Sequence, residues 1–144
     1  HMIYGCYSWG NDGRMNGATY TYNSAGEWET IVLDFGNRLV FAYDAAGRQI
    51  RRDDYDKDGT LTMYVTTEYG NGYERDNFYD ADGTLSGYNV HLYNEQGQRV
   101  RYEHHAPDGT LTSYSIDVYD DAGNQIAWEH YDADGNLTGR DVYN

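Results

Sequence analysis

Several residue types are scarce in this chain of 144 residues, and each scarcity excludes a class of protein. The one cysteine, Cys6, cannot form an internal disulfide or a four-cysteine zinc site. Leu, Ile, Val and Phe together supply only 22 residues, and no apolar run approaches the roughly 20 residues of a membrane span. No charged segment followed by an apolar segment stands at the N-terminus, so we expect no retained export signal, and His1-Met2 resembles a cloning remnant.

Basic residues are also few, since 10 Lys and Arg stand against 24 Asp and Glu, for a formal net charge of −14. Because such a surface repels phosphates, we expect no nucleic-acid partner. So few aliphatic residues at so high a charge would ordinarily indicate disorder. The chain has, however, 17 Tyr and 3 Trp, whose rings bury apolar area while their polar atoms stay hydrated. These aromatic residues predict a folded chain with a polar, aromatic core.

A five-residue pattern recurs along the chain: an aromatic residue, Asp or Asn, two variable residues and Gly. Two copies are Tyr43-Asp44-Ala45-Ala46-Gly47 and Tyr55-Asp56-Lys57-Asp58-Gly59. The glycines form two interleaved series with spacings of 24 to 26 residues, so a unit of about 25 residues holds two strands and two turns. We therefore predict a single domain over residues 1–144 built from these units.

The composition of the pattern also predicts its turn. Asp or Asn in the first place and Gly in the fourth fit a type I turn followed by a residue with positive φ, which is the hairpin loop with a G1 bulge. A similar role is expected for Gly36 and Gly72, and Asn11-Asp12-Gly13 starts the series. The structural turn glycines predicted from the pattern are Gly26, Gly47, Gly59, Gly83, Gly97, Gly109, Gly123 and Gly135.

About eleven such turns predict an all-β fold, an antiparallel up-and-down meander of about twelve strands, and no window keeps a helical period. The sheet is expected to form a curled single sheet or a barrel or half-shell, because closure would also remove exposed edges. Across the Gly109 turn Ala106 faces Thr110, so we expect Tyr102 opposite Tyr114, and we expect His130 on the next strand opposite Tyr114 as well. This register predicts one aromatic face, and an opposite charged face that carries Arg51, Arg75 and Arg101.

The Tyr-Asp-x-x-Gly units resemble the YD-repeat or RHS-repeat pattern of bacterial surface and toxin-delivery proteins. The likeness covers residues 20–144 and includes Tyr43–Arg48 and Tyr55–Thr60. It implies long β-sheets that spiral into shells around a cargo, or adhesion scaffolds in animal relatives; this chain is too short to enclose a cargo. A weaker likeness links the tandem hairpins to MORN-type repeats and to choline-binding wall repeats, which have a Trp in nearly every unit.

Two interpretations of the predicted aromatic face stay open. Its side chains form either the core or a ligand-binding platform for sugar rings and other flat molecules. His104 and His130 occupy the same place in successive repeats, and we expect them to be hydrogen-bonded within this face rather than zinc ligands, since His91 and His105 are expected on the opposite face. The candidate ligand-binding residues are Tyr88, Tyr102, Tyr114, Trp128, His104 and His130.

One turn resembles half of a calcium-binding loop. The order Asp54-x-Asp56-x-Asp58-Gly59 copies the start of an EF-hand loop, so these three carboxylates would bind calcium if their oxygens converged. Val65 stands where that loop requires a bidentate Glu, and Asp is also an ordinary turn residue. Apart from calcium, we predict no cofactor.

These observations predict a protein without catalytic residues. Our first hypothesis is a structural or adhesive β-repeat module of a bacterial surface or secreted protein, and hence an extracellular location. The alternatives are a carbohydrate-binding or cell-wall-binding module that uses the aromatic face, and an acidic inhibitor or immunity-type protein. The expected partners are a carbohydrate or another protein, with self-association through sheet edges or further repeats.

Overall fold

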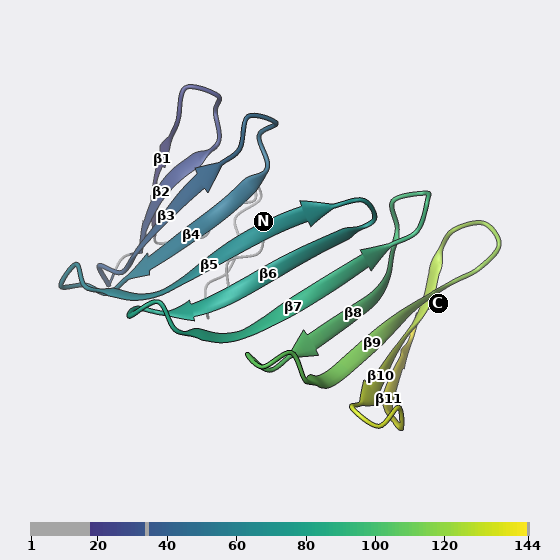
Figure 1. The fold of residues 1–144 in the computed structure, drawn as a ribbon. Coiled ribbons are helices and arrows are strands. Elements are labelled where there is room, and N and C mark those ends of the chain that lie inside the picture. Colours follow the sequence, from purple (N-terminus) through teal and green to yellow (C-terminus); the bar gives the residue numbers. More distant parts are fainter. Residues whose placement is uncertain (1–17, 34, 144) are drawn as a thin grey trace. The chain divides into compact units, whose positions relative to one another are not determined.

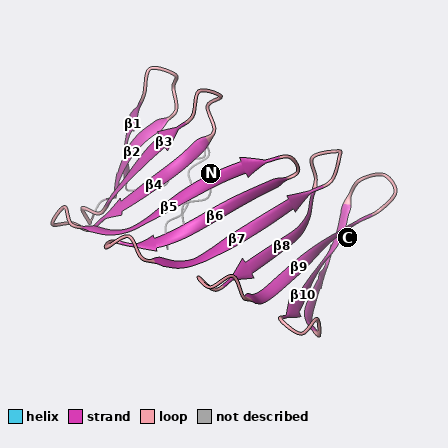
Figure 2. Cartoon of the chain, viewed as in Figure 1, coloured by secondary structure: helices cyan, strands magenta, loops and turns pink. Residues whose placement is uncertain are grey.

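The computed structural model describes residues 18–33 and 35–143, and every regular element in this part of the chain is a β-strand (Figure 2). The strands are antiparallel, and their order in the sheet follows the sequence from β1 to β11 (Figure 1). β1 and β11 end this order, so the described strands form an open sheet rather than a closed barrel. The strands are β1 (Ala18–Tyr22), β2 (Trp28–Leu33), β3 (Arg38–Tyr43), β4 (Gln49–Tyr55), β5 (Leu61–Gly70), β6 (Tyr73–Asp80), β7 (Leu85–Tyr93), β8 (Arg99–His105), β9 (Leu111–Tyr119), β10 (Gln125–Asp132) and β11 (Leu137–Val142).

The predicted all-β meander is thereby confirmed, with eleven strands in the described part of the chain. The predicted turn at Asn11-Asp12-Gly13 lies outside the described residues. Within residues 18–33 and 35–143 the structure contains no helix long and apolar enough to cross a bilayer.

The predicted turn chemistry is also confirmed. All eight predicted turn glycines, together with Gly36 and Gly72, have φ between 77° and 95°. In the turn that starts at Asp44, the Gly47 N–H donates to the Asp44 carbonyl at 3.0 Å. Asp44 Oδ1 accepts the N–H groups of Ala46 and Arg48, each at 2.9 Å. Asp or Asn recurs in this place because its side chain satisfies two backbone donors that the turn leaves free.

Seven hairpins carry a second irregularity, which the predicted register lacks, whereas the Gly36 hairpin pairs Ile31 with Leu39 and Val32 with Arg38 without one. In the hairpins of Gly26, Gly47, Gly83, Gly97, Gly109, Gly123 and Gly135, the third residue after the glycine is left without a partner on the opposite strand. For Gly109, His105 pairs with Leu111 but His104 pairs with Ser113, so Thr112 is bulged. In three of these turns the bulged residue is Thr or Ser, and its hydroxyl donates to a carbonyl across the hairpin: Ser86 to Phe78, Thr112 to His104 and Thr138 to His130. Thr62, at the same place after Gly59, makes the same bond to Asp54.

This bulge makes the predicted register wrong. A slip of one residue moves every later side chain of a strand to the other face of the sheet. Tyr102 pairs with Ser115 rather than with Tyr114, and Tyr114 pairs with Glu103. On the next strand Tyr131, and not His130, lies opposite Tyr114.

The chain divides into two compact units, His1–Tyr64 and Val65–Asn144. The first contains an apolar cluster of Ile31, Leu33, Leu39 and Phe41 on β2 and β3. Ile31 is fully buried, and it pairs directly with Leu39 across the two strands. Half-buried side chains pack around this cluster: Ala18, Tyr20, Trp28 and Tyr43.

The second unit has a different interior. Among its described residues only Val65 and Ala127 are buried hydrophobic residues, whereas Asn77, Ser115 and Asp117 are buried polar residues. Since aliphatic burial is small, interactions between polar and aromatic side chains on the two faces of the sheet carry much of the packing.

Candidate functional site

One face of the second unit carries rings sandwiched between successive strands. The Arg75 guanidinium on β6 lies 3.8 Å from the ring centroid of Tyr88 on β7. On β8, the His105 ring stacks on Tyr88 with a centroid separation of 4.6 Å and an interplanar angle of 7°. Because β7 lies between β6 and β8, the Tyr88 ring has a neighbour on each side. We call this surface the stacked face: Arg75, Tyr88, Arg101, Glu103, His105, Tyr114, Glu129 and Tyr131.

The same sandwich recurs 26 residues later along the chain. Arg101 lies 3.9 Å from the ring centroid of Tyr114, and Tyr131 stacks on that ring at 4.9 Å with an interplanar angle of 7°. A cation–π contact of this kind contributes about 0.5–1 kcal/mol at exposed sites, and a stacked ring pair contributes about 0.5–1.5 kcal/mol. The sandwich is therefore a repeating contact between adjacent strands.

A hydrogen bond within the strand holds each arginine over its ring. Arg75 Nε donates to Asn77 Oδ1, and Arg101 Nε donates to Glu103 Oε2, both at 2.7 Å. In the first unit, Arg51 likewise lies 4.2 Å from the Tyr64 ring centroid and donates to the residue two places later, Asp53, at 2.8 Å. Arg51 and Arg101 thus form ion pairs along their own strands, whereas the ion pair of Arg75 crosses to Glu68 on β5, at 3.7 Å.

The predicted grouping of the aromatic candidates is wrong, because the bulges divide them between the two faces. Tyr88 and Tyr114 lie on the stacked face, where both sides of each ring are covered. The other candidates, Tyr102, His104, Trp128 and His130, alternate with stacked-face residues and lie on the opposite face. The six residues therefore form no common platform. Their role in ligand binding stays a prediction.

The opposite face of β6, β7 and β8 carries a hydrogen-bonded polar group, here called the polar face: Glu74, Asp76, Asn89, His91, Tyr102 and His104. The Asn89 amide donates to Tyr102 Oη at 2.7 Å, and its Oδ1 lies 2.8 Å from His104 Nδ1. Burial lowers the pKa of His104, and His91 and His105 lower it further by charge repulsion. Because the amide oxygen Oδ1 of Asn89 only accepts, His104 Nδ1 donates to it.

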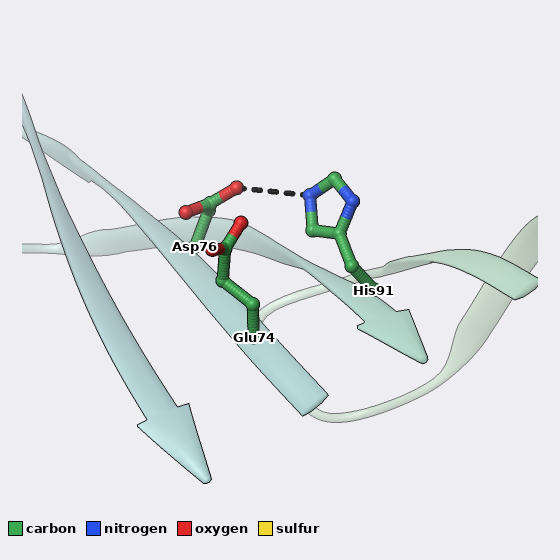
Figure 3. A group of neighbouring side chains, drawn as sticks. All are labelled: Glu74, Asp76 and His91. Carbon is green, nitrogen blue, oxygen red and sulfur yellow. Dashed lines mark hydrogen bonds and ion pairs between the residues drawn. The ribbon is translucent and has the colours of Figure 1, made fainter. Parts of the chain in front are cut away.

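Three potential metal ligands meet on the polar face (Figure 3). Glu74 pairs directly with His91 across β6 and β7, and Asp76 stands two residues further along β6, on the same side. Their ligand atoms lie within 4.8 Å of one another, and Asp76 Oδ2 is 3.1 Å from His91 Nε2. Burial raises the pKa of Glu74, the neighbouring Asp76 charge raises it further, and His91 opposes the rise.

This cluster was not predicted from the sequence, because His91 was expected on the same face as His105. In the structure His91 shares the polar face with His104, while His105 lies on the stacked face. A signal was present in the sequence: the hydroxyl residue Ser86 stands at the third place after Gly83, where Thr62, Thr112 and Thr138 follow their glycines. Counting that bulge brings His91 opposite Glu74.

The predicted calcium ligands do not converge. Asp54 accepts two hydrogen bonds from Arg52, at 2.8 and 3.0 Å. Asp56 Oδ1 accepts the N–H groups of Asp58 and Thr60, at 2.9 and 3.0 Å, as a turn residue does. Within residues 18–33 and 35–143, three possible metal ligands gather only at Glu74, Asp76 and His91.

The remaining candidates lie near the last strand. His130 Nε2 is 3.0 Å from Asp141 Oδ2. The His130 and Trp128 rings lie edge to face, with a centroid separation of 4.1 Å. The buried Trp128 Nε1 has no hydrogen-bond partner in the described part of the chain.

In the first unit, a shallow depression of about 250 Å³ is lined by Gly26, Glu27, Trp28 and Tyr43.

No protein-family model matches the sequence, and no curated protein is similar to it. Solved structures share the fold at 15% sequence identity. In a Photorhabdus luminescens Tc holotoxin pore structure, the similarity has a TM-score of 0.52 and covers 91% of this chain but 8% of that one. In a TcdB2-TccC3 structure without the hypervariable C-terminal region, the TM-score is 0.53, with 89% of this chain and 6% of that chain covered.

A Bacteroides fragilis protein of unknown function is of comparable size. It shares the fold at a TM-score of 0.55, over 75% of this chain and 94% of its own. These similarities concern the fold, and they are consistent with an RHS-like β-repeat architecture.

Proposed function

We propose that this chain is a non-catalytic structural β-repeat module, one segment of an array in which each unit packs against the next. The observation that supports this function most is the Arg-Tyr-aromatic sandwich of the stacked face. It recurs with a period of 26 residues, and each copy takes its three side chains from three successive strands. Such a contact joins neighbouring units, as stability in repeat proteins requires.

The fold comparisons agree with a modular role, since this chain matches 6–8% of the length of the much larger Tc toxin chains. An extracellular or bacterial-surface location and a protein partner follow from this proposal. A carbohydrate partner gains no support from Tyr88 and Tyr114, because an arginine and a second ring cover the two sides of each.

A duplication of one unit tests the proposal. Residues 85–110 begin after the Gly83 turn and end after the Gly109 turn, so a second copy inserted after Thr110 keeps every strand in register. If units interact mainly with their neighbours, the lengthened chain folds and its urea midpoint rises. Circular dichroism and urea titration measure both properties.

A matched insertion isolates the stacked contact. In this control the inserted copies of Tyr88 and Arg101 are replaced by Ser, which leaves length and turns unchanged but removes the sandwich. We expect this control to lack the gain in midpoint. If the chain with the unaltered duplication is unfolded, or if its urea midpoint is lower than that of the parent chain, the modular role is contradicted. A thermal shift caused by a cell-wall oligosaccharide would favour the carbohydrate-binding alternative instead.

A further inference from the structure

The Glu74, Asp76 and His91 cluster interrupts the repeat. The stacked face reproduces its residues 26 positions later, as from Arg75 to Arg101 and from Tyr88 to Tyr114. The same shift applied to the cluster leads to Val100, Tyr102 and Asp117, which cannot supply one imidazole and two carboxylates. A feature required by the fold alone would be expected in each unit, so this cluster belongs to one place in the chain.

The geometry of the cluster suits a small cation. Metal bonds to imidazole nitrogen and carboxylate oxygen are about 2.0–2.2 Å long, so tetrahedral ligand atoms lie roughly 3.3–3.5 Å apart. Asp76 Oδ2 and His91 Nε2 are already 3.1 Å apart, and all three ligand atoms lie within 4.8 Å. Small rotations of the Glu74 side chain would complete three ligands and leave a fourth position for water.

Neighbouring groups hold two of the three ligands in place. Thr67 Oγ1 donates to Asp76 Oδ1 at 2.9 Å, which leaves Asp76 Oδ2 directed at His91. The Tyr102 ring lies 4.5 Å from the His91 ring and limits its rotation. Such outer contacts orient metal ligands and strengthen binding.

The third ligand, Glu74, is a half-buried carboxylate with no hydrogen-bond or ion-pair partner among the described residues. Beside it stands the carboxylate of Asp76, which repels it. A divalent cation would neutralise both charges, and the imidazole favours zinc or a similar transition metal over calcium or magnesium, which prefer oxygen ligands. From these contacts we propose that Glu74, Asp76 and His91 bind one divalent transition-metal ion, of the zinc class, and thereby join β6 to β7.

Titration of the full chain with zinc chloride tests the site. Isothermal calorimetry is expected to give saturable binding with one zinc ion per chain. His91→Asn and Glu74→Gln are each expected to weaken the affinity about tenfold or more. His130→Asn is the matched control, because His130 also faces one carboxylate, Asp141 at 3.0 Å, but lacks a second. We expect its affinity to equal that of the unaltered chain.

Imidazole NMR signals of the unaltered chain provide a second readout that needs no variant. The first equivalent of zinc is expected to shift the His91 ring signals before those of His104, His105 and His130. Thermal melts without zinc establish that the variants are folded. The absence of saturable binding would overturn the proposal, and so would an affinity unchanged by His91→Asn or a first shift at another histidine.

Discussion

Replacement of Arg99 by alanine tests how far a buried charge pair stabilises the second unit. Arg99 Nε and Nη2 donate to the two oxygens of Asp117, at 2.8 and 3.2 Å. The Asp117 side chain is only 2% exposed, whereas the Arg99 side chain is 33% exposed. Arg99→Ala would leave a buried carboxylate with one remaining side-chain donor, Gln125 Nε2 at 2.8 Å.

The cost follows from this burial. Removing one partner of a buried ion pair costs about 3–5 kcal/mol, because the charge that remains is not compensated. Since Gln125 still donates and water reaches part of the Arg99 site, we expect a loss of about 2–4 kcal/mol in the free energy of unfolding. The corresponding fall in melting temperature is roughly 2–4 °C per kcal/mol.

A matched control separates burial from pairing. Arg48 Nε lies 2.9 Å from Asp44 Oδ2, nearly the same distance, but its side chain is 54% exposed. Exposed pairs contribute about 0–1 kcal/mol, so Arg48→Ala is expected to cost less than about 1 kcal/mol.

Urea titration measures both variants, and hydrogen exchange of the β8 and β9 amides reports on the second unit by itself. This local measurement is needed because the chain has two compact units and its unfolding need not be two-state. Equal small losses for Arg99→Ala and Arg48→Ala would refute the reasoning from burial.

Three further results are expected. Gly97 has φ of 79°, and nothing lies within 4 Å of an added Cβ. Gly97→Ala should therefore cost about 1–2 kcal/mol in the free energy of unfolding from backbone conformation alone, and Gly97→Asn should cost less. Equal urea midpoints for the two variants would contradict this. Thr112→Val removes the hydroxyl that donates to the His104 carbonyl at 3.0 Å, with an expected loss of about 0.5–1.5 kcal/mol in urea titration. Hydrogen bonds lower the pKa of Asp132 in the folded state, chiefly the bond from the Asn136 N–H and also that from the Asp134 N–H. The Asp132 carboxylate therefore stabilises the fold above its unfolded pKa, and this stabilisation is lost as the pH falls through its lower folded pKa. Asp132→Asn retains the acceptor oxygen and should flatten the melting temperature between pH 5 and pH 2, relative to the unaltered chain, by differential scanning fluorimetry.

The predicted face assignment failed at a specific point. An extended ladder from the Gly109 turn requires Thr112 to have a partner, and it therefore places Tyr102 with Tyr114. In the structure Thr112 is bulged, and its hydroxyl bonds to a carbonyl instead. Hydrophobic alternation could not reveal this, because the second unit has too few aliphatic residues to mark one face as buried. The Thr or Ser at the third place after Gly59, Gly83, Gly109 and Gly135 was the available signal.

The metal-ligand cluster shows the same dependence on register. Glu74 and Asp76 share a face because they stand two residues apart in one strand, which the sequence suffices to predict. Their meeting with His91 depends on which residue of β7 lies opposite Glu74, and the bulge at Ser86 decides that. The spacing of Asp54, Asp56 and Asp58 left calcium binding open beside ordinary turn chemistry, and in the structure Arg52 and the turn amides already engage two of these carboxylates.

The sequence by itself determined the strands, their order and their turns. These features depend on interactions within five residues, in which Asp or Asn accepts turn amides and Gly adopts positive φ, and short turns oblige successive strands to pair. The tertiary structure alone decided which side chains share a face, as in the sandwiches of Tyr88 and Tyr114 and in the cluster at His91. The physical reason is that the side-chain period of a strand is two, so a single unpaired residue in a hairpin exchanges the two faces.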